Sequence, residues 1–256
     1  MTHPVQPLNL KKSLGQHFLK DESVIKKIIE FLKQNPFSQL LEIGPGAGAL
    51  TKSLFAIDDI DFKAVEIDKE KVAYLKTSYP GLTDHLIEAD FLSMEKPFLG
   101  SFTIIGNFPY NISTEILFKI LDWRQDVDLV IGMFQKEVAQ RIAASEGNKI
   151  YGVTSVLLQA FFKVEYLFEV NEQAFKPPPK VKSAVIRLTP RRELPPVRTE
   201  KMFFLLVKTA FNQRRKTLRN AVRSLFTEEV LRDPLFNKRA EQLTILEFEE
   251  LTWRMK

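Results

Sequence analysis

Short apolar runs alternate with amphipathic stretches along residues 1–190. The runs predict buried strands at 40–43, 62–67, 86–90, 102–105 and 129–134. Apolar residues at helical spacing predict helices at 21–34, 68–78, 113–121 and 135–144. Because strands that alternate with helices through short links form parallel sheets, we expect an α/β domain with helices on both faces of the sheet.

Two further β-rich runs, 161–168 and 181–188, are separated by a linker that is too short for a helical crossover. We therefore expect these two strands to pair antiparallel at the edge of the sheet. The linker contains three consecutive prolines, 177–179, which stiffen it. This stiffness predicts that Phe175 points outward or into a cleft.

The segment 190–196 is polar, rich in proline and free of strand pattern, which makes it the expected domain boundary. Beyond it, apolar residues recur at helical spacing from Phe203 to Phe211 and from Leu218 to Leu225. The sequence thus predicts a first domain over 1–190 and a small all-helical domain over 197–256.

The net charge of +5 lies entirely in the C-terminal segment. Residues 197–256 carry 13 basic and 8 acidic side chains, and the preceding residues are neutral overall. Arg215, Arg219 and Arg223 recur at every fourth position, so we expect one basic stripe on a helix. Such a patch is typical of a surface that binds nucleic-acid phosphates, although a solvated helix face has the same pattern.

The chain has no cysteine and three histidines, which excludes disulfides and thiolate metal sites and argues against a structural zinc. No apolar run approaches the length needed to span a membrane, and residues 1–12 lack the apolar core of a signal peptide. We therefore expect a cytoplasmic protein that needs no metal and does not contact a membrane.

A glycine-rich loop, Gly44-Pro45-Gly46-Ala47-Gly48, follows the first predicted strand, 40–43. Glycines let a ligand approach the backbone, but Pro45 lacks an N–H that could hold a phosphate. This pattern favours a nucleoside over a dinucleotide. Glu66, at the end of the second strand, lies at the offset from which an acid reaches ribose hydroxyls. Asp90, at the end of the third, is placed to accept from an adenine amine.

The quartet Asn107-Phe108-Pro109-Tyr110 follows strand 102–105, at the edge where a parallel sheet binds its ligand. The Asn107 side-chain oxygen and the Phe108 carbonyl oxygen can accept both hydrogens of an exocyclic amine. Tyr110 can stack on the base. In isolation the tetrapeptide is an ordinary turn. Together with the glycine loop and the two acids it fits chemistry at adenine N6.

The chain resembles the bacterial KsgA/RsmA family of rRNA adenine dimethyltransferases at these positions, and the resemblance extends over almost the whole chain. The similar segments are 12–19, 42–51, 107–110, 175–183 and 211–220. The last, Phe-Asn-Gln-Arg-Arg-Lys-Thr-Leu-Arg-Asn, is typical of the enzymes that modify the small ribosomal subunit. Phe108 departs from the family, which usually has Leu, Ile or Val there, and His17 is Asn in some members.

The resemblance implies S-adenosylmethionine as methyl donor and a Rossmann-like methyltransferase fold, with a mostly parallel sheet and an antiparallel edge hairpin. It implies a cofactor site formed by Gln16, His17, Leu19, Gly44, Gly46, Glu66, Ile67, Asp90, Phe91 and Asn107. His17 is expected to contribute its backbone, not its imidazole. The implied catalytic residues are Asn107, Phe108, Pro109 and Tyr110. The expected RNA-binding residues are Phe175, Arg214, Arg215, Lys216, Arg219 and Arg223.

The implied reaction dimethylates N6 of two adjacent adenosines in the 3′-terminal hairpin loop of 16S rRNA, within a 30S precursor. We expect the enzyme to act as a monomer. Three alternatives stay open. A macrolide-resistance type of 23S rRNA methyltransferase shares the pocket but typically lacks the 211–220 segment. A DNA adenine-N6 methyltransferase uses a similar quartet, and a non-enzymatic assembly factor could retain the same fold.

Overall fold

The computed structural model describes residues 17–191, 193 and 195–256. The chain divides into two compact units, the first formed by 1–139 and 165–190 and the second by 140–164 and 191–256. The second unit thus includes 140–164, which the sequence pattern had grouped with the first domain. The assignment of catalysis to 1–190 and of RNA binding to 197–256 stays a prediction.

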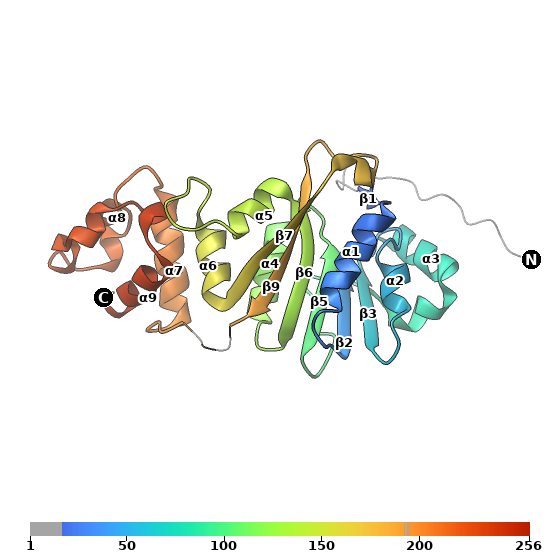
Figure 1. Ribbon diagram of the computed structural model, residues 1–256. Helices are drawn as coiled ribbons and strands as arrows, with labels where there is room; N and C mark the ends of the chain where they lie inside the picture. The colour runs from blue at the N-terminus through green and yellow to red at the C-terminus, as the bar shows by residue number, and fades with distance from the viewer. Residues whose placement is uncertain (1–16, 192, 194) are drawn as a thin grey trace, which may run out of the picture. The chain divides into compact units, whose positions relative to one another are not determined.

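Within residues 17–191, seven strands form one mixed sheet in the order β4-β3-β2-β5-β6-β9-β7 (Figure 1). The strands are β2 (Gln39–Ile43), β3 (Asp61–Glu66), β4 (Leu86–Glu88), β5 (Phe102–Asn107), β6 (Val127–Gln135), β7 (Phe162–Val170) and β9 (Ser183–Pro190). Strands β4, β3, β2, β5 and β6 pair in parallel, whereas β9 pairs antiparallel with β6. The predicted α/β class is confirmed, and β7 and β9, the two runs expected to pair at the sheet edge, are neighbouring strands there.

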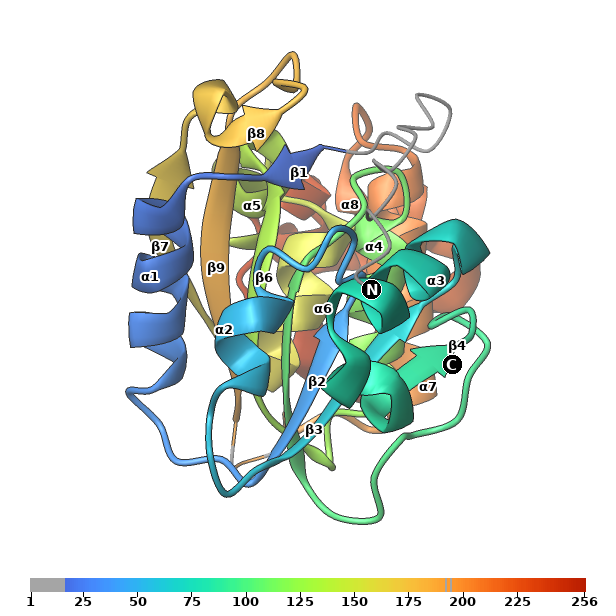
Figure 2. The ribbon, with the colours of Figure 1, turned by 90° about the vertical axis from the view of Figure 1, so that its right-hand side faces the viewer.

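A second, two-stranded sheet pairs β1 (Phe18–Leu19) with β8 (Phe175–Lys176). It lies beyond the upper ends of β6 and β9 in Figure 2. The backbone N–H groups of Lys20 and Asp21 both donate to the Ala174 carbonyl oxygen and extend this contact. The chain segments before α1 and after β7 are thereby held together next to the glycine loop.

Among the described residues, the first unit has helices at the four predicted positions and one further helix after the glycine loop. They are α1 (Glu22–Leu32), α2 (Thr51–Phe55), α3 (Lys69–Ser78), α4 (Ser113–Asp122) and the start of α5 (Lys136–Ile142). Asp21 caps α1 through its side chain, which accepts from the N–H groups of Ser23 and Val24. Asp68 caps α3 in the same way through the Glu70 N–H.

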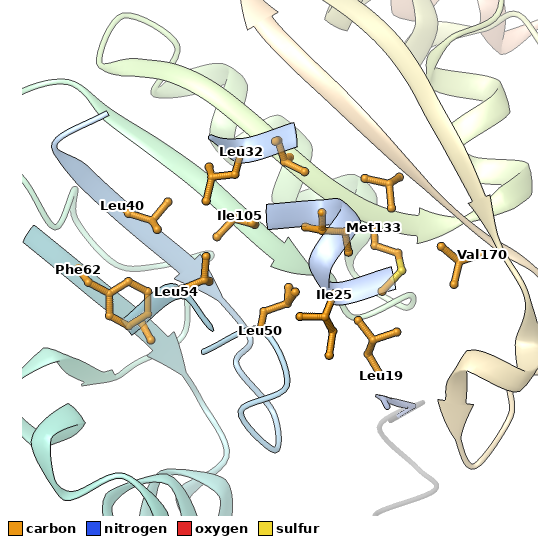
Figure 3. Close-up of a cluster of buried hydrophobic side chains, with 14 of the residues drawn as sticks. Leu19, Ile25, Leu32, Leu40, Leu50, Leu54, Phe62, Ile105, Met133 and Val170 are labelled. Carbon is orange, nitrogen blue, oxygen red and sulfur yellow. The ribbon is translucent and has the colours of Figure 1, made fainter. Parts of the chain in front are cut away.

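One face of the sheet packs against α1, α2 and α3 through a continuous apolar cluster (Figure 3). The strands contribute Leu40, Phe62, Ile105 and Met133, and the helices contribute Ile25, Leu32, Leu54 and Leu75. Side chains along a strand alternate between the two faces of the sheet. Residues two positions away from these four strand residues therefore point to the same face of β2, β3, β5 and β6.

The second unit is helical, with α6 (Val153–Phe161), α7 (Glu200–Asn212), α8 (Leu218–Ala221) and α9 (Ile245–Trp253), and short 3-10 turns lie between α8 and α9. Its core includes Phe203, Leu206, Phe236, Phe248 and Leu251, all fully buried. Sequence patterning did not predict α6. The predicted second helix of this region is also much shorter than expected, because the chain leaves the α-helical path after Ala221.

Candidate active site

Three polar side chains converge at the carboxyl ends of neighbouring parallel strands. Glu42 lies two residues after Leu40, and Asn107 lies two residues after Ile105, so both point to the face that carries the apolar cluster. Glu66 lies two residues after Ala64 and shares that face. The register places Glu42 beside Ala64 on one side and Ile105 on the other. Glu66 and Asn107 therefore flank the position just beyond Glu42.

A cavity opens at this convergence, within the first unit. Its walls combine the strand ends with the segment before α1, the glycine loop and the quartet. They are formed by His17, Phe18, Leu19, Glu42, Gly44, Pro45, Gly46, Ala47, Ala49, Leu50, Glu66, Ile67, Asp68, Lys71, Asn107, Phe108, Pro109, Tyr110, Asn111 and Ile112. The structure thus brings together most of the residues that the sequence selected for cofactor binding and the whole quartet.

The glycine loop has the left-handed backbone that its sequence requires. Gly46 has φ of 61°, and a Cβ there would lie 3.4 Å from the Phe18 ring. Gly48 has φ of 85°, and a Cβ there would lie 2.8 Å from the Tyr79 ring. An L-residue would be strained at either position, so the loop can follow this path next to the cavity only with glycine.

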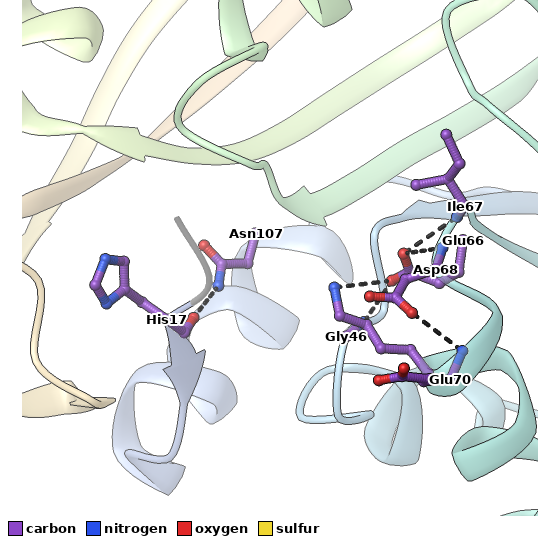
Figure 4. A network of polar contacts seen from close by, with 8 residues as sticks. His17, Gly46, Glu66, Ile67, Asp68, Glu70 and Asn107 are labelled. Carbon is purple, nitrogen blue, oxygen red and sulfur yellow. Dashed lines mark hydrogen bonds and ion pairs between the residues drawn. The ribbon is translucent and has the colours of Figure 1, made fainter. Parts of the chain in front are cut away.

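The Glu66 carboxylate holds the glycine loop and the end of β3 together (Figure 4). Its Oε1 accepts from the N–H groups of Ile67 and Asp68 at 3.1 and 3.0 Å, and its Oε2 accepts from Gly46 N–H at 3.3 Å. The Lys71 ammonium lies 3.6 Å from Oε2. Glu66 is 5% exposed, so these donors bind its carboxylate in a site that is almost closed to solvent. A carboxylate has about four acceptor sites, which leaves capacity for a ligand hydroxyl.

Asn107 is fixed by the backbone of the segment before α1. Its Nδ2 donates to the His17 carbonyl oxygen at 3.3 Å (Figure 4). Because the amide nitrogen makes this bond, the Oδ1 atom is left to accept from a ligand amine. The His17 imidazole is engaged elsewhere, since its Nδ1 lies 2.9 Å from the Pro177 carbonyl oxygen.

Tyr110 is held at the cavity by two contacts. Its hydroxyl lies 2.6 Å from the Ser183 hydroxyl, and its ring stacks on the His17 ring with centroids 5.8 Å apart. Burial raises the pKa of Tyr110 above its usual value, so the phenol stays neutral at physiological pH. A neutral aromatic ring in a fixed orientation is suited to stacking on a planar base.

Phe108 occupies the opposite face of β5 from Asn107. It is 1% exposed, and its ring meets the Phe134 ring edge-on at 5.0 Å between centroids. A Cβ at Gly106 or Gly132 would lie 2.7 Å from the Phe108 ring. The two glycines therefore make the room that this phenylalanine needs. The side chain packs beside the pocket, and its carbonyl group stays at the strand end.

Glu42 is a buried residue of this site that the sequence pattern does not single out. It is 1% exposed, and its Oε2 has no hydrogen-bond partner in the described residues. Burial, reinforced by the negative charge of Glu66, raises the pKa of Glu42 to about 8, although the nearby Thr51 lowers it in part. The sequence signal for this residue is an acid inside the otherwise apolar run 40–43. Because acids are rarely buried without a partner, such a position indicates a functional site.

Asp90 and Phe91 do not belong to the cavity wall described above. Asp90 Oδ1 accepts from the Leu92 N–H at 2.9 Å, which closes the turn after β4. Phe91 is buried against the Trp123 ring. The role of Asp90 in holding an adenine amine stays a prediction. Gln16 lies outside the described residues.

Two expectations about the RNA-binding residues are corrected. Phe175 points neither outward nor into the cavity, because β8 pairs with β1 and turns its ring into the apolar cluster, where it is 1% exposed. The three arginines of the expected stripe do not share a helix. Arg215 lies in the turn after α7, Arg219 in α8 and Arg223 in a 3-10 turn.

Several of these arginines make contacts inside the second unit. Arg214 donates to the carbonyl oxygens of Lys149 and Tyr151. Arg219 Nε donates to the Leu231 carbonyl oxygen at 2.9 Å, and Arg223 pairs with Glu228 at 2.8 Å. Arg215 and Lys216, by contrast, are exposed in the turn after α7.

The described residues contain no group of three or more His, Asp or Glu side chains that could hold a metal ion. They also contain no helix that is long and apolar enough to cross a membrane.

Comparison with known proteins places this site in a family. A sequence model of the family "Ribosomal RNA adenine dimethylase" matches residues 8–252. "Ribosomal RNA small subunit methyltransferase A" of Cytophaga hutchinsonii is 51% identical over 252 residues, which cover 97% of this chain and 98% of that protein. The protein of the same name from Phocaeicola vulgatus is 52% identical over 247 residues, covering 94% and 88%.

Two solved structures share the fold over almost the whole chain. A dimethyladenosine transferase from Plasmodium falciparum aligns with a TM-score of 0.76 at 26% identity and covers 92% of this chain and 96% of that one. The 23S rRNA methyltransferase ErmE aligns with a TM-score of 0.65 at 26% identity, covering 91% and 99%. The mixed sheet and the cavity at its strand ends define a Rossmann-like methyltransferase. The chain belongs to the ribosomal RNA adenine dimethylase family.

Proposed function

We propose that the chain transfers methyl groups from S-adenosylmethionine to N6 of two adjacent adenosines in the 3′-terminal hairpin loop of 16S rRNA. It dimethylates each adenosine within a 30S precursor in the cytoplasm. The observation that carries this proposal is the high identity to small-subunit methyltransferases over nearly the full length of the chain. The convergence of the quartet and the glycine loop on one cavity supports it.

The residues of the cavity fit the methyl donor. Glu66 has remaining acceptor capacity for a ribose hydroxyl, and Gly44 and Gly46 let the ligand approach the loop backbone. Glu42 Oε2, which has no partner within 17–191, 193 and 195–256, is a buried acceptor that a positively charged ligand would satisfy. S-adenosylmethionine supplies an electrophilic methyl group bound to a sulfonium, whose departure needs no general acid.

Asn107 and Phe108 prepare the target nitrogen for attack. The N6 lone pair of adenine is delocalised into the ring, so the enzyme has to draw it back to the nitrogen. Asn107 Oδ1 and the Phe108 carbonyl oxygen accept the two N–H groups and favour a pyramidal nitrogen. The hydrogen bond from Asn107 to His17 fixes the amide before the base arrives. This pre-organisation lowers the barrier without moving a proton in the step.

Tyr110 positions the base that has been turned out of the RNA loop. Its ring offers a stacking surface, and the hydroxyl contact to Ser183 restricts rotation of the ring. Exposed basic side chains of the second unit, Arg215 and Lys216 first among them, hold the RNA backbone. Phe175 has no part in this proposal, because its ring is buried.

The experiment that tests the proposal measures tritium transfer from labelled S-adenosylmethionine to ribosomal particles from a strain that lacks the native enzyme. We expect label in 16S rRNA of 30S particles and none in 50S particles prepared in parallel. Label in 23S rRNA alone would favour the activity of ErmE, the structural relative that modifies that RNA. Absence of label from both particles would refute the proposed activity.

A further inference from the structure

Glu42 is a buried acid of the cavity that takes no part in the methyl-transfer step of the proposed reaction. It sits at the end of β2, points to the face shared by Glu66 and Asn107, and lines the cavity. It is 1% exposed, yet its Oε2 has no hydrogen-bond partner in the described residues. A carboxylate left in this way would carry a large desolvation cost, whereas the protonated acid would not.

The surroundings of Glu42 make the contrast with Glu66 clear. Glu66 is satisfied by three backbone N–H groups and lies 3.6 Å from the Lys71 ammonium. Glu42 faces the negative charge of Glu66 and the phenol of Tyr79, and its partly compensating polar neighbour is Thr51. The other ionisable side chains of the cavity wall are His17, Asp68, Lys71 and Tyr110. With Lys71 committed to Glu66, the cavity wall formed by the described residues offers the carboxyl of Glu42 no cation of its own.

We propose that Glu42 senses the charge of the ligand in the cavity: it ionises when a cationic group enters, and thereby favours the cationic methyl donor over the neutral thioether product. This inference rests on the proposed use of S-adenosylmethionine. The proton leaves the Glu42 carboxyl for solvent when the donor binds. It returns from solvent after methyl transfer, when the sulfonium has become a thioether and the positive charge has gone.

The donor and the product form a matched pair of probes for this charge. S-adenosylmethionine and S-adenosylhomocysteine share the nucleoside and the amino-acid groups and differ in the methyl group and its sulfonium charge. Any difference in proton release on binding therefore reports on the sulfonium. At the effective dielectric of a protein interior, one charge at the separation set by such a cavity changes affinity on the order of tenfold.

The pH dependence has a defined sign. Burial and Glu66 hold the pKa of Glu42 at about 8 in the free protein, and a bound cation lowers it. Proton release then couples to binding, so the affinity for the donor rises with pH up to about 8 and levels off above it. Because the thioether lacks the sulfonium charge, the product's affinity rises less over the same range.

The test is calorimetric titration at pH 7.5 in two buffers of different ionisation enthalpy, which counts protons released per ligand bound. The protein is titrated with S-adenosylmethionine and separately with S-adenosylhomocysteine. Variants Glu42→Gln and Glu42→Asp are compared with a matched control, Glu249→Gln. Glu249 is a second buried acid, 4% exposed with a pKa raised by burial, and lies in α9 of the second unit.

We expect the native chain and Glu249→Gln to release more protons with the donor than with the product. We expect Glu42→Gln to abolish that difference and to lower the donor-to-product affinity ratio on the order of tenfold. Glu42→Asp retains a carboxyl and should retain the excess proton release. Melting temperatures measured without ligand on the same samples separate this effect from a loss of folding.

Equal proton release for both ligands in the native chain, or an unchanged affinity ratio in a folded Glu42→Gln variant, would overturn the charge-sensing role. Either result leaves the methyltransferase proposal standing, because both ligands still bind. If neither ligand binds the native chain, the use of S-adenosylmethionine itself is refuted and the inference falls with it.

Discussion

The role of Glu66 leads to a prediction in which two effects of one side chain can be separated. Glu66→Gln keeps the shape of the residue and one acceptor oxygen. That oxygen can still accept from Ile67 and Asp68 N–H, but the new NH₂ group faces the Gly46 N–H and the Lys71 ammonium. Two donors in a site that is 5% exposed then lose their acceptor.

The contacts set the size of the effect. A hydrogen bond to a charged acceptor contributes about 1.5–3 kcal/mol. The bond from Gly46 is long at 3.3 Å and Lys71 is at 3.6 Å, so we take the lower end for the pair, about 2 kcal/mol of unfolding free energy. For a chain of this length that corresponds to a melting temperature lower by roughly 4–8 °C. Loss of a charged acceptor for ribose hydroxyls should weaken cofactor binding by a further 1–3 kcal/mol, roughly 5- to 150-fold.

The assay is calorimetric binding of S-adenosylmethionine together with thermal melting without ligand. Glu88→Gln is the matched control, because Glu88 is paired in register with Glu66 at the end of the adjacent strand β4. Its ion pair with Lys69 is long, at 3.9 Å, and well exposed. Both affinity and melting temperature should match the native chain in this control. Native affinity in a folded Glu66→Gln variant would remove Glu66 from the cofactor site.

Further predictions concern the quartet and the basic surface. Asn107→Ala should lower methyl transfer on the order of 100-fold while RNA binding by filter retention persists, since Oδ1 matters most as N6 becomes nucleophilic; native turnover would exclude this role. The double variant Arg215→Gln, Lys216→Gln should make the salt dependence of RNA binding shallower by about 1.5 in log–log slope. Arg219→Gln should instead lower the melting temperature, because Arg219 Nε donates to the Leu231 carbonyl oxygen. An unchanged slope in the double variant and a shallower slope in Arg219→Gln would move the RNA surface to Arg219. Phe108→Leu should lower the free energy of unfolding, measured by chemical denaturation, by about 1–2 kcal/mol, because it removes the edge-on contact with the Phe134 ring. The variant should keep its activity, since the carbonyl group of residue 108 carries the chemistry. An inactive but folded variant would show that the ring shapes the pocket.

The strands and helices around the site were predictable because local signals agree there with the final packing. Asp21 caps α1 where the sequence indicates a start, and the apolar run before Asn107 forms β5. Helix α6 was missed because six of the nine residues of Val153–Phe161 are apolar and its start is β-branched, so its pattern does not distinguish a buried helix from a strand.

The parts of the site that escaped prediction depend on contacts between distant segments. Phe175 is buried because β8 pairs with β1, and no local pattern indicates that pairing. Arg214 and Arg219 donate to backbone carbonyl groups, which every residue carries and no sequence motif reveals. The burial of Glu42 escapes prediction because an acid with an unsatisfied oxygen ordinarily stays exposed, and Oε2 has no partner among the described residues.

The central claim is tested most directly by the modification state of 16S rRNA in living cells. A strain that lacks its native small-subunit dimethylase is supplied with this chain or with Asn107→Ala, and the 3′-terminal fragment of its 16S rRNA is analysed by mass spectrometry. The account predicts two adjacent N6,N6-dimethyladenosines with the native chain and unmodified adenosines with the variant. Unmodified adenosines in cells that contain the folded native chain would contradict it.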